Sequence, residues 1–133
     1  MSKKPKLIIV DDDVDLTDIL TECVELFGLS VVGVGHDGKE AAELYAELNP
    51  DLVLLDAIMP NYDGFYAISQ IKKMNPDAKI IALTAEHRPE TIDRLKRENV
   101  LILSKPFDTV QFSSICNQIA NHTPFEVICS VHN

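Results

Sequence analysis

Three apolar runs in this chain each lead into a charged residue, and this pattern limits the possible folds more than any other feature of the sequence. Residues 7–10 precede Asp11, residues 52–55 precede Asp56, and residues 100–104 precede Lys105. Short, continuous apolar runs are typical of strands that are covered on both faces, as in a parallel sheet. In such sheets, ligands bind outside the carboxyl ends of the strands. We therefore expect these charged side chains to meet at one edge.

Strand-like and helix-like segments alternate five times along the chain. Strands are expected at Lys6–Val10, Leu29–Val34, Asp51–Leu55, Lys79–Leu83 and Val100–Leu103. Helices are expected at Val14–Phe27, Lys39–Leu48, Phe65–Met74, Pro89–Glu98 and Val110–Ala120. This alternation predicts an α/β fold, an open and doubly wound parallel sheet with helices on both faces. Five strands fit the flavodoxin-like order 2-1-3-4-5.

Length and charge narrow the class of protein. A chain of 133 residues has the size of one domain, and we expect a polar lead-in at residues 1–5, the domain at 6–121 and a tail at 122–133. The tail has a partial alternation that is compatible with an extra short strand. A net charge of −9 argues against direct nucleic-acid binding. No apolar stretch approaches the ~18 residues of a membrane span, so we expect a cytoplasmic protein without a membrane partner.

The acidic residues at the strand ends suggest metal and phosphoryl chemistry. Asp11, Asp12 and Asp56 would bring three carboxylates into one crevice, where like charges raise each other's pKa unless a cation is present. Mg²⁺ suits this setting, because it takes a few carboxylates together with waters and phosphate oxygens. Thr84 would add a hydroxyl and Lys105 a positive charge. One carboxylate would then be free to attack phosphorus, as aspartate does in phosphoenzyme chemistry.

Acidic residues after a strand are not by themselves a site, since many only cap a helix or face solvent. We expect Asp13 or Asp15 to be a helix cap. Asp56 alone would also be weak support for a function. The prediction of a site depends on the acid pair, a hydroxyl and a lysine each standing at the end of a different strand.

The segments that carry these residues resemble the motifs of a known family, the receiver domain of two-component response regulators, and are similar to its single-domain chemotaxis type. The matching segments are residues 8–13, 56–64, 83–85 and 104–107. They follow one another at the family's spacing, and the resemblance covers about residues 6–121. The flavodoxin-like fold is also what this resemblance implies.

The resemblance implies a role for each matching residue. The protein would accept a phosphoryl group from a sensor histidine kinase or a phosphotransfer protein, in a reaction that depends on Mg²⁺. Asp56 would be the phospho-acceptor, Asp11 and Asp12 would hold Mg²⁺ together with Asp56 and the backbone carbonyl of Ile58, Thr84 would hydrogen-bond the phosphoryl group, and Lys105 would pair with it.

Two positions depart from the family's pattern. Ile102 stands three residues before Lys105, where the family usually carries Tyr or Phe, and residues 98–100 replace a common Gly-Ala. We expect these changes to leave phosphorylation intact. They do affect how a signal would reach the face formed by residues 88–121, and the turn before the last strand must close differently.

The expected output is binding of a downstream protein, by a monomer or a phosphorylation-dependent dimer, because no DNA-binding or catalytic segment follows residue 121. The alternative is an interaction module of the same fold that works without phosphorylation, which Ile102 favours. A phosphohydrolase would need an acid at the position of Ile58, so we do not expect an enzyme. A flavin-binding protein is disfavoured because the loop after the first strand is acidic.

Overall fold

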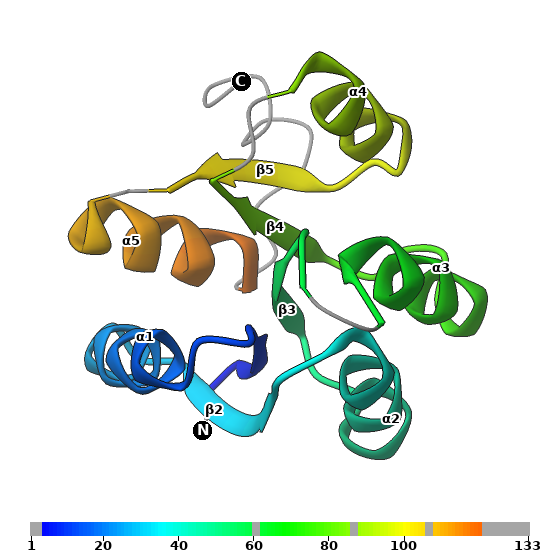
Figure 1. The fold of residues 1–133 in the computed structure, drawn as a ribbon. Helices are drawn as coiled ribbons and strands as arrows, with labels where there is room; N and C mark the ends of the chain where they lie inside the picture. The colour runs from blue at the N-terminus through cyan, green and yellow to red at the C-terminus, as the bar shows by residue number, and fades with distance from the viewer. Residues whose placement is uncertain (1–3, 60–61, 86–87, 106–107, 121–133) are drawn as a thin grey trace.

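The computed structural model describes residues 4–59, 62–85, 88–105 and 108–120, and its centre is a five-stranded parallel sheet in the order β2-β1-β3-β4-β5 (Figure 1). The strands are β1 (Lys6–Val10), β2 (Ser30–Gly35), β3 (Leu52–Asp56), β4 (Ile80–Thr84) and β5 (Leu101–Ser104). The helices in the described residues are α1 (Val14–Leu26), α2 (Gly38–Leu48), α3 (Gly64–Met74), α4 (Pro89–Arg97) and α5 (Thr109–Ala120). The predicted flavodoxin-like, doubly wound α/β fold and its strand order are confirmed. The predicted tail lies outside the described residues.

Two apolar layers hold the fold together, each between one face of the sheet and the helices that cover this face in Figure 1. Ile8 and Val10 of β1 pack with residues of α2, α3 and α4, whereas Leu7 and Ile9 pack with residues of α1 and α5. All four side chains are fully buried. Burial of one such side chain stabilises the fold by about 1.5–3 kcal/mol, so β1 is a rigid base for the acidic residues that follow it.

Acidic residues cap the first three helices. Asp13, Asp37 and Asp63 are the N-caps of α1, α2 and α3. The Asp13 carboxylate accepts a hydrogen bond from the backbone N–H of Leu16 at 3.1 Å. The expectation that Asp13 or Asp15 caps a helix is therefore confirmed for Asp13. Capping gives these carboxylates a structural role, and it separates them from the acids of the candidate site.

The strands β3 and β4 continue one residue further than the apolar pattern predicts. Asp56 and Thr84 are the last residues of these strands, and they pair with Leu83 and Ser104 of their neighbours. The ladder continues beyond them, because the N–H of Lys105 donates to the carbonyl of Thr84 at 2.8 Å. Their side chains thus project from hydrogen-bonded backbone and not from free loops.

The turn between α4 and β5 closes without a glycine. Asn99 takes the left-handed conformation there, with a φ of 56°. Asparagine tolerates this region better than most residues, which explains how residues 98–100 replace a glycine-containing turn.

As for the helices, none in the described part of the chain combines the length and apolar character that crossing a membrane would need.

Candidate functional site

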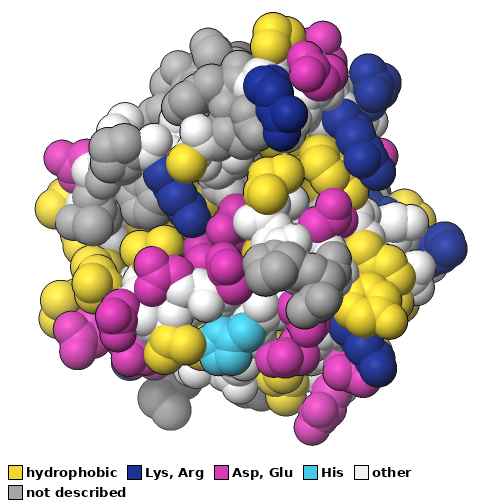
Figure 2. Space-filling model, viewed as in Figure 1, with side chains coloured by type: hydrophobic (Ala, Val, Ile, Leu, Met, Phe, Trp, Pro, Cys, Tyr) yellow, Lys and Arg dark blue, Asp and Glu magenta, His cyan; other side chains and the backbone are white. Residues whose placement is uncertain are grey.

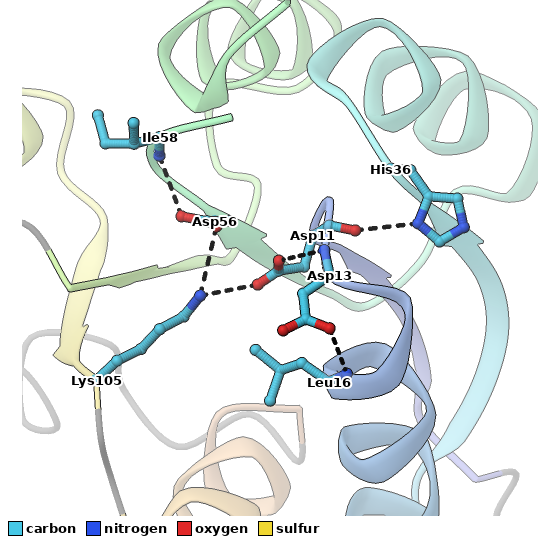
Figure 3. Close-up of polar contacts among 7 residues, drawn as sticks. All are labelled: Asp11, Asp13, Leu16, His36, Asp56, Ile58 and Lys105. Carbon is cyan, nitrogen blue, oxygen red and sulfur yellow. Dashed lines mark hydrogen bonds and ion pairs between the residues drawn. The ribbon is translucent and has the colours of Figure 1, made fainter. Parts of the chain in front are cut away.

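Charged side chains from three strand ends converge at the carboxyl edge of the sheet (Figure 3). Lys105 Nζ lies 2.9 Å from Asp11 Oδ2 and 3.4 Å from Asp56 Oδ2. Asp11 is 1% exposed and Asp56 is 7% exposed, whereas Asp12 is exposed. Figure 2 shows acidic side chains gathered in the middle of this face, with basic side chains beside them. The expected meeting of these residues at one edge is observed.

Backbone N–H groups orient the two buried carboxylates. Asp11 Oδ1 accepts a hydrogen bond from the N–H of Asp13 at 2.9 Å, and Asp56 Oδ1 accepts one from the N–H of Ile58 at 3.1 Å. In each case the donor is two residues further along the chain, as in an Asx-turn. The second oxygen of each carboxylate is left to face Lys105. The loop after each strand therefore sets the direction of its own acid.

The electrostatics of the site favour an additional cation. Burial is the main cause that raises the pKa of Asp56, and the charge of Asp11 adds to it, while the N–H of Ile58 and Lys105 oppose the rise. Burial alone would lower the pKa of Lys105, but its hydrogen bond to Asp11 and the charge of Asp56 outweigh burial, and the pKa is raised. One ammonium therefore faces more negative charge than it neutralises.

The donor set fits a hard divalent cation. One carboxylate oxygen from each of Asp11, Asp12 and Asp56 can be chosen so that all three lie within 4.8 Å of one another. Ligand oxygens around Mg²⁺ are about 3–4 Å apart, because each bond is about 2.1 Å long. A small adjustment of the side chains would close the remaining difference. All three donors are carboxylate oxygens, the ligands that Mg²⁺ prefers over nitrogen or sulfur.

A hollow of about 340 Å³ opens beside the acids and has room for a phosphoryl group. Thr84, which is 1% exposed, reaches it from the end of β4, and Ile58, the residue whose carbonyl is a predicted metal ligand, lies on its wall. The lining residues are Asp56, Ile58, Thr84, Ala85 and Lys105. Asp56 is thus the buried acid that lines the hollow, and Thr84 and Lys105, the residues of the predicted hydroxyl and ammonium, line it too.

The sequence analysis missed His36, which follows β2 at the same edge. Its Nδ1 lies 3.0 Å from the backbone carbonyl of Asp11 (Figure 3). Its position directly after a strand was only a weak signal, because β2 lacks the continuous buried apolar run that precedes the acids. Gly64 is also part of the site's frame, because an added Cβ would lie 2.6 Å from the carbonyl oxygen of Asp56.

Known proteins share both the sequence and the fold of this chain. Residues 7–117 match the model of the response regulator receiver domain. The chain is 33% identical over 116 residues to the chemotaxis protein CheY of Thermotoga maritima, a match that covers 86% of this chain and 97% of that protein. It is 39% identical over 111 residues to a probable C4-dicarboxylate response regulator, DctR, of Halalkalibacterium halodurans, over 80% of this chain and 48% of that longer protein.

Solved structures of other proteins have a fold similar to that of this chain. In the CheX–CheY–BeF₃–Mg²⁺ complex from Borrelia burgdorferi, the matching chain superposes with a TM-score of 0.78 at 26% identity, over 84% of this chain and 86% of that one. The receiver domain of the putative response regulator NarL from Mycobacterium tuberculosis gives a TM-score of 0.82 at 20% identity, over 91% of this chain and 99% of that one, which shows the shared fold.

Proposed function

The chain belongs to the response regulator receiver domain family, a family of signalling modules and not of enzymes, and from this membership we propose that it is a Mg²⁺-dependent phospho-acceptor of two-component signalling. The observation that carries the proposal is the position of Asp56. This carboxylate is buried, lines an open hollow, and lies 3.4 Å from an ammonium that faces the same hollow.

Asp56 is a better nucleophile than Asp11 for a geometric reason. Both oxygens of Asp11 are engaged at 2.9 Å, by the N–H of Asp13 and by Lys105. Among the described residues, Asp56 Oδ2 has only the longer contact of 3.4 Å with Lys105, which exceeds the usual length of a hydrogen bond to nitrogen. Asp56 Oδ2 is therefore the oxygen with the weaker engagement, and it faces the hollow from which a donor would approach.

The proposed reaction is a transfer of one phosphoryl group. Asp56 Oδ2 forms the new bond to phosphorus, and the bond between phosphorus and the donor's nitrogen or oxygen breaks with its electron pair leaving on the donor. Lys105 then pairs with a phosphoryl oxygen, and the Thr84 hydroxyl donates to another. Asp11, Asp12, Asp56 and the carbonyl of Ile58 would hold Mg²⁺, which when bound offsets the charge of the phosphoryl oxygens.

The comparisons also support the kind of partner. The Borrelia burgdorferi structure contains CheX with CheY, BeF₃ and Mg²⁺, so that relative assembles with another protein and with the ions named. We infer a histidine kinase or phosphotransfer protein as the donor and a downstream protein as the target. We propose a cytoplasmic location for this exchange. The net charge of −9 fits a protein target better than a nucleic acid.

Intact-protein mass spectrometry after incubation with acetyl phosphate, with and without Mg²⁺, tests this proposal. Wild type is expected to gain one phosphoryl group only when Mg²⁺ is present, and the product should be lost at high pH, as acyl phosphates are. Asp56→Ala should gain none. Asp51→Ala is the matched control, since Asp51 is an exposed aspartate at the opposite end of β3. Labelling of Asp56→Ala at the wild-type level would contradict the assignment.

A phosphorylation-independent interaction module is the second candidate, and one observation favours it. Ile102 is half-buried and packs against the apolar layer that α2, α3 and α4 cover, so no aromatic ring is present at this position to follow the movement of Thr84. The absence of any phosphoryl gain in the experiment above would support this candidate.

The side chain of Ile58 also leads to a prediction about the lifetime of the phosphoryl group. This side chain is 46% exposed on the wall of the hollow and offers no hydrogen bond to an attacking water. We expect slow self-dephosphorylation, and a several-fold faster loss in an Ile58→Asn variant. Wild-type turnover much faster than that of the variant would contradict this expectation.

A further inference from the structure

We propose, on the basis of the proposed function, that His36 is a positioning residue of the Mg²⁺ site. Its ring donates a hydrogen bond to the backbone carbonyl of Asp11 and thereby sets the direction of the Asp11 and Asp12 carboxylates. His36 would not touch the metal or the phosphoryl group. It acts through the acidic loop that follows β1, residues 11–13. His36 contacts this loop from the end of β2, just before α2 (Figure 3).

The direction of this hydrogen bond follows from its chemistry. His36 Nδ1 lies 3.0 Å from the carbonyl oxygen of Asp11, and a carbonyl oxygen can only accept. Nδ1 therefore carries the hydrogen, whether the ring is neutral or charged. The contact joins residues 25 positions apart in the sequence, so it fastens the end of one strand to the end of its neighbour.

The end of β2 holds the peptide backbone of Asp11 at two points. The N–H of Asp11 donates to the carbonyl of Gly35 at 3.1 Å, and its carbonyl accepts from the ring of His36, the next residue. With both polar groups of Asp11 held, the backbone rotation that places Asp12 is restricted. Asp12 is exposed, and among the described residues its side chain makes no hydrogen bond or ion pair that would restrict it, so this restriction matters most for Asp12.

The start of α2 holds His36 itself in place. The N–H of His36 donates to Glu40 Oε1 at 3.1 Å, and the N–H of Glu40 donates to the carboxylate of the N-cap Asp37 at 2.8 Å. This arrangement resembles a capping box, in which the third helical residue reaches back to the chain before the helix. A Cβ on Gly35 would lie 3.1 Å from Glu40 Cβ, which shows how closely β2 and α2 pack here. These contacts therefore fix the position of the backbone that carries the His36 ring.

All four polar groups of Asp11 are engaged in this arrangement. Its N–H, its carbonyl and its two carboxylate oxygens contact Gly35, His36, Asp13 and Lys105, respectively. Loss of the His36 contact would let residues 11 and 12 sample other orientations, and Mg²⁺ would have to order them again on binding. Removal of an outer partner of a metal ligand typically lowers metal affinity 10–100-fold. Because His36 acts on the backbone, we expect the lower end, about tenfold.

Two substitutions separate the donor from the bulk of the ring. His36→Asn keeps an N–H donor near the position of Nδ1, whereas His36→Leu keeps apolar volume and removes the donor. Isothermal titration with Mg²⁺ alone, at one fixed pH for all variants, gives the affinity of each variant. We expect affinity within about threefold of wild type for His36→Asn and a loss of about tenfold for His36→Leu. Lys39→Leu, an exposed change on α2, is the matched control and should bind as wild type does.

A measurement without metal gives a second readout. The N–H of Asp13 donates to Asp11 Oδ1, so its hydrogen exchange should become faster in His36→Leu and stay slow in His36→Asn, with no Mg²⁺ present. Equal Mg²⁺ affinity in wild type and His36→Leu would overturn the role of His36 while the proposed function stands. Equal losses in both His36 variants would also overturn it, because packing of the ring would then be what matters. A wild-type protein that binds no Mg²⁺ would overturn the proposed function as well.

Discussion

The two ends of the parallel sheet differ in the burial and pairing of their charged residues. At the carboxyl end, two buried carboxylates face one ammonium, and the exposed Asp12 lies beside them. At the amino end, Asp51 is exposed and accepts a hydrogen bond from the N–H of Lys6 at 2.8 Å. Nearby, the amide of Asn75 donates to the buried Tyr45 hydroxyl at 3.1 Å. The amino end pairs its polar groups through neutral or solvent-exposed contacts.

This difference indicates at which end of the sheet a functional site is expected. The amino end also has a hollow, of about 290 Å³ and lined by residues that include Tyr45, Asp51 and Asn75, so a hollow alone does not mark a site. What distinguishes the carboxyl end is buried, unbalanced negative charge, which lowers stability unless a ligand compensates it. Buried charged groups that lower stability in this way are candidates for ligand binding or catalysis. At the amino end, the polar contacts instead hold the loops that join helices to strands.

The largest expected effect concerns the backbone at the carboxyl end. In Gly64→Ala the new Cβ would lie 2.6 Å from the Asp56 carbonyl oxygen and 2.7 Å from Ala57 Cα. Backbone must shift to make room, and we expect the free energy of unfolding to fall by about 3 kcal/mol, as for severe overpacking. Denaturant unfolding followed by circular dichroism measures this loss.

Gly33→Ala is the control for that change. Its nearest neighbours are the far ends of the Leu48 and Leu44 side chains, at 2.9 and 3.1 Å, and these can move. We expect a loss below about 1 kcal/mol. Equal losses in the two alanine variants would show that close backbone approach does not set the site's frame.

The next effect tests the charge balance of the carboxyl end. Lys105→Met leaves Asp11 and Asp56 without their ammonium partner, and we expect a loss of about 1–2 kcal/mol at neutral pH, a reduced value because Lys105 is 21% exposed. The loss should shrink on acidification, as Asp56, whose pKa burial raises, takes up a proton. Lys6→Met at the amino end, where the side chain is exposed, should change stability by less than about 0.5 kcal/mol. Chemical denaturation of both variants at several pH values decides this, and equal effects would remove the contrast between the ends.

A smaller effect is expected at the amino end. Asn75→Ala removes the donor to the Tyr45 hydroxyl and the acceptor for the N–H of Asp77. We expect a loss of about 1 kcal/mol. Because the groups involved are neutral, this loss should be the same in mildly acidic and neutral buffer, as thermal unfolding at each pH can show. A strong dependence on pH would mean that charge matters at this end too.

Much of the site was predictable because strand ends are visible in the sequence. Asp11, Asp56 and Lys105 each follow an apolar run, and the topology of a parallel sheet brings such positions together. The exact ends of β3 and β4 were one residue off, because backbone pairing continues through Asp56 and Thr84 after the apolar pattern stops.

His36 was not predictable by the same reasoning. It follows β2, an edge strand with exposed Val32 and Val34, so the run before it is not a buried one. Its contact also joins a ring to a backbone carbonyl, and no pattern of residue types marks a bond to the main chain. The left-handed Asn99 is a similar case, since its conformation depends on how α4 and β5 meet.

We expect the unbalanced carboxylates at the carboxyl end to lower the free energy of unfolding until a cation binds there. Folding raises the pKa of Asp56 above its ordinary 3.8, chiefly through burial, so folding favours the protonated form. The stability from this preference is complete below about pH 3.8 and is lost as the pH rises through the raised pKa. Once ionised, Asp56 therefore lowers stability relative to a neutral side chain of the same shape.

The most direct test is thermal unfolding of wild type and Asp56→Asn at about pH 7, with and without Mg²⁺. Without Mg²⁺, Asp56→Asn should unfold a few degrees above wild type, which corresponds to about 1 kcal/mol for a domain of this size. Mg²⁺ should then raise the midpoint of wild type more than that of the variant, and Asp51→Asn should show no gain. A variant less stable than wild type in the absence of Mg²⁺, together with no Mg²⁺ effect on wild type, would contradict the account.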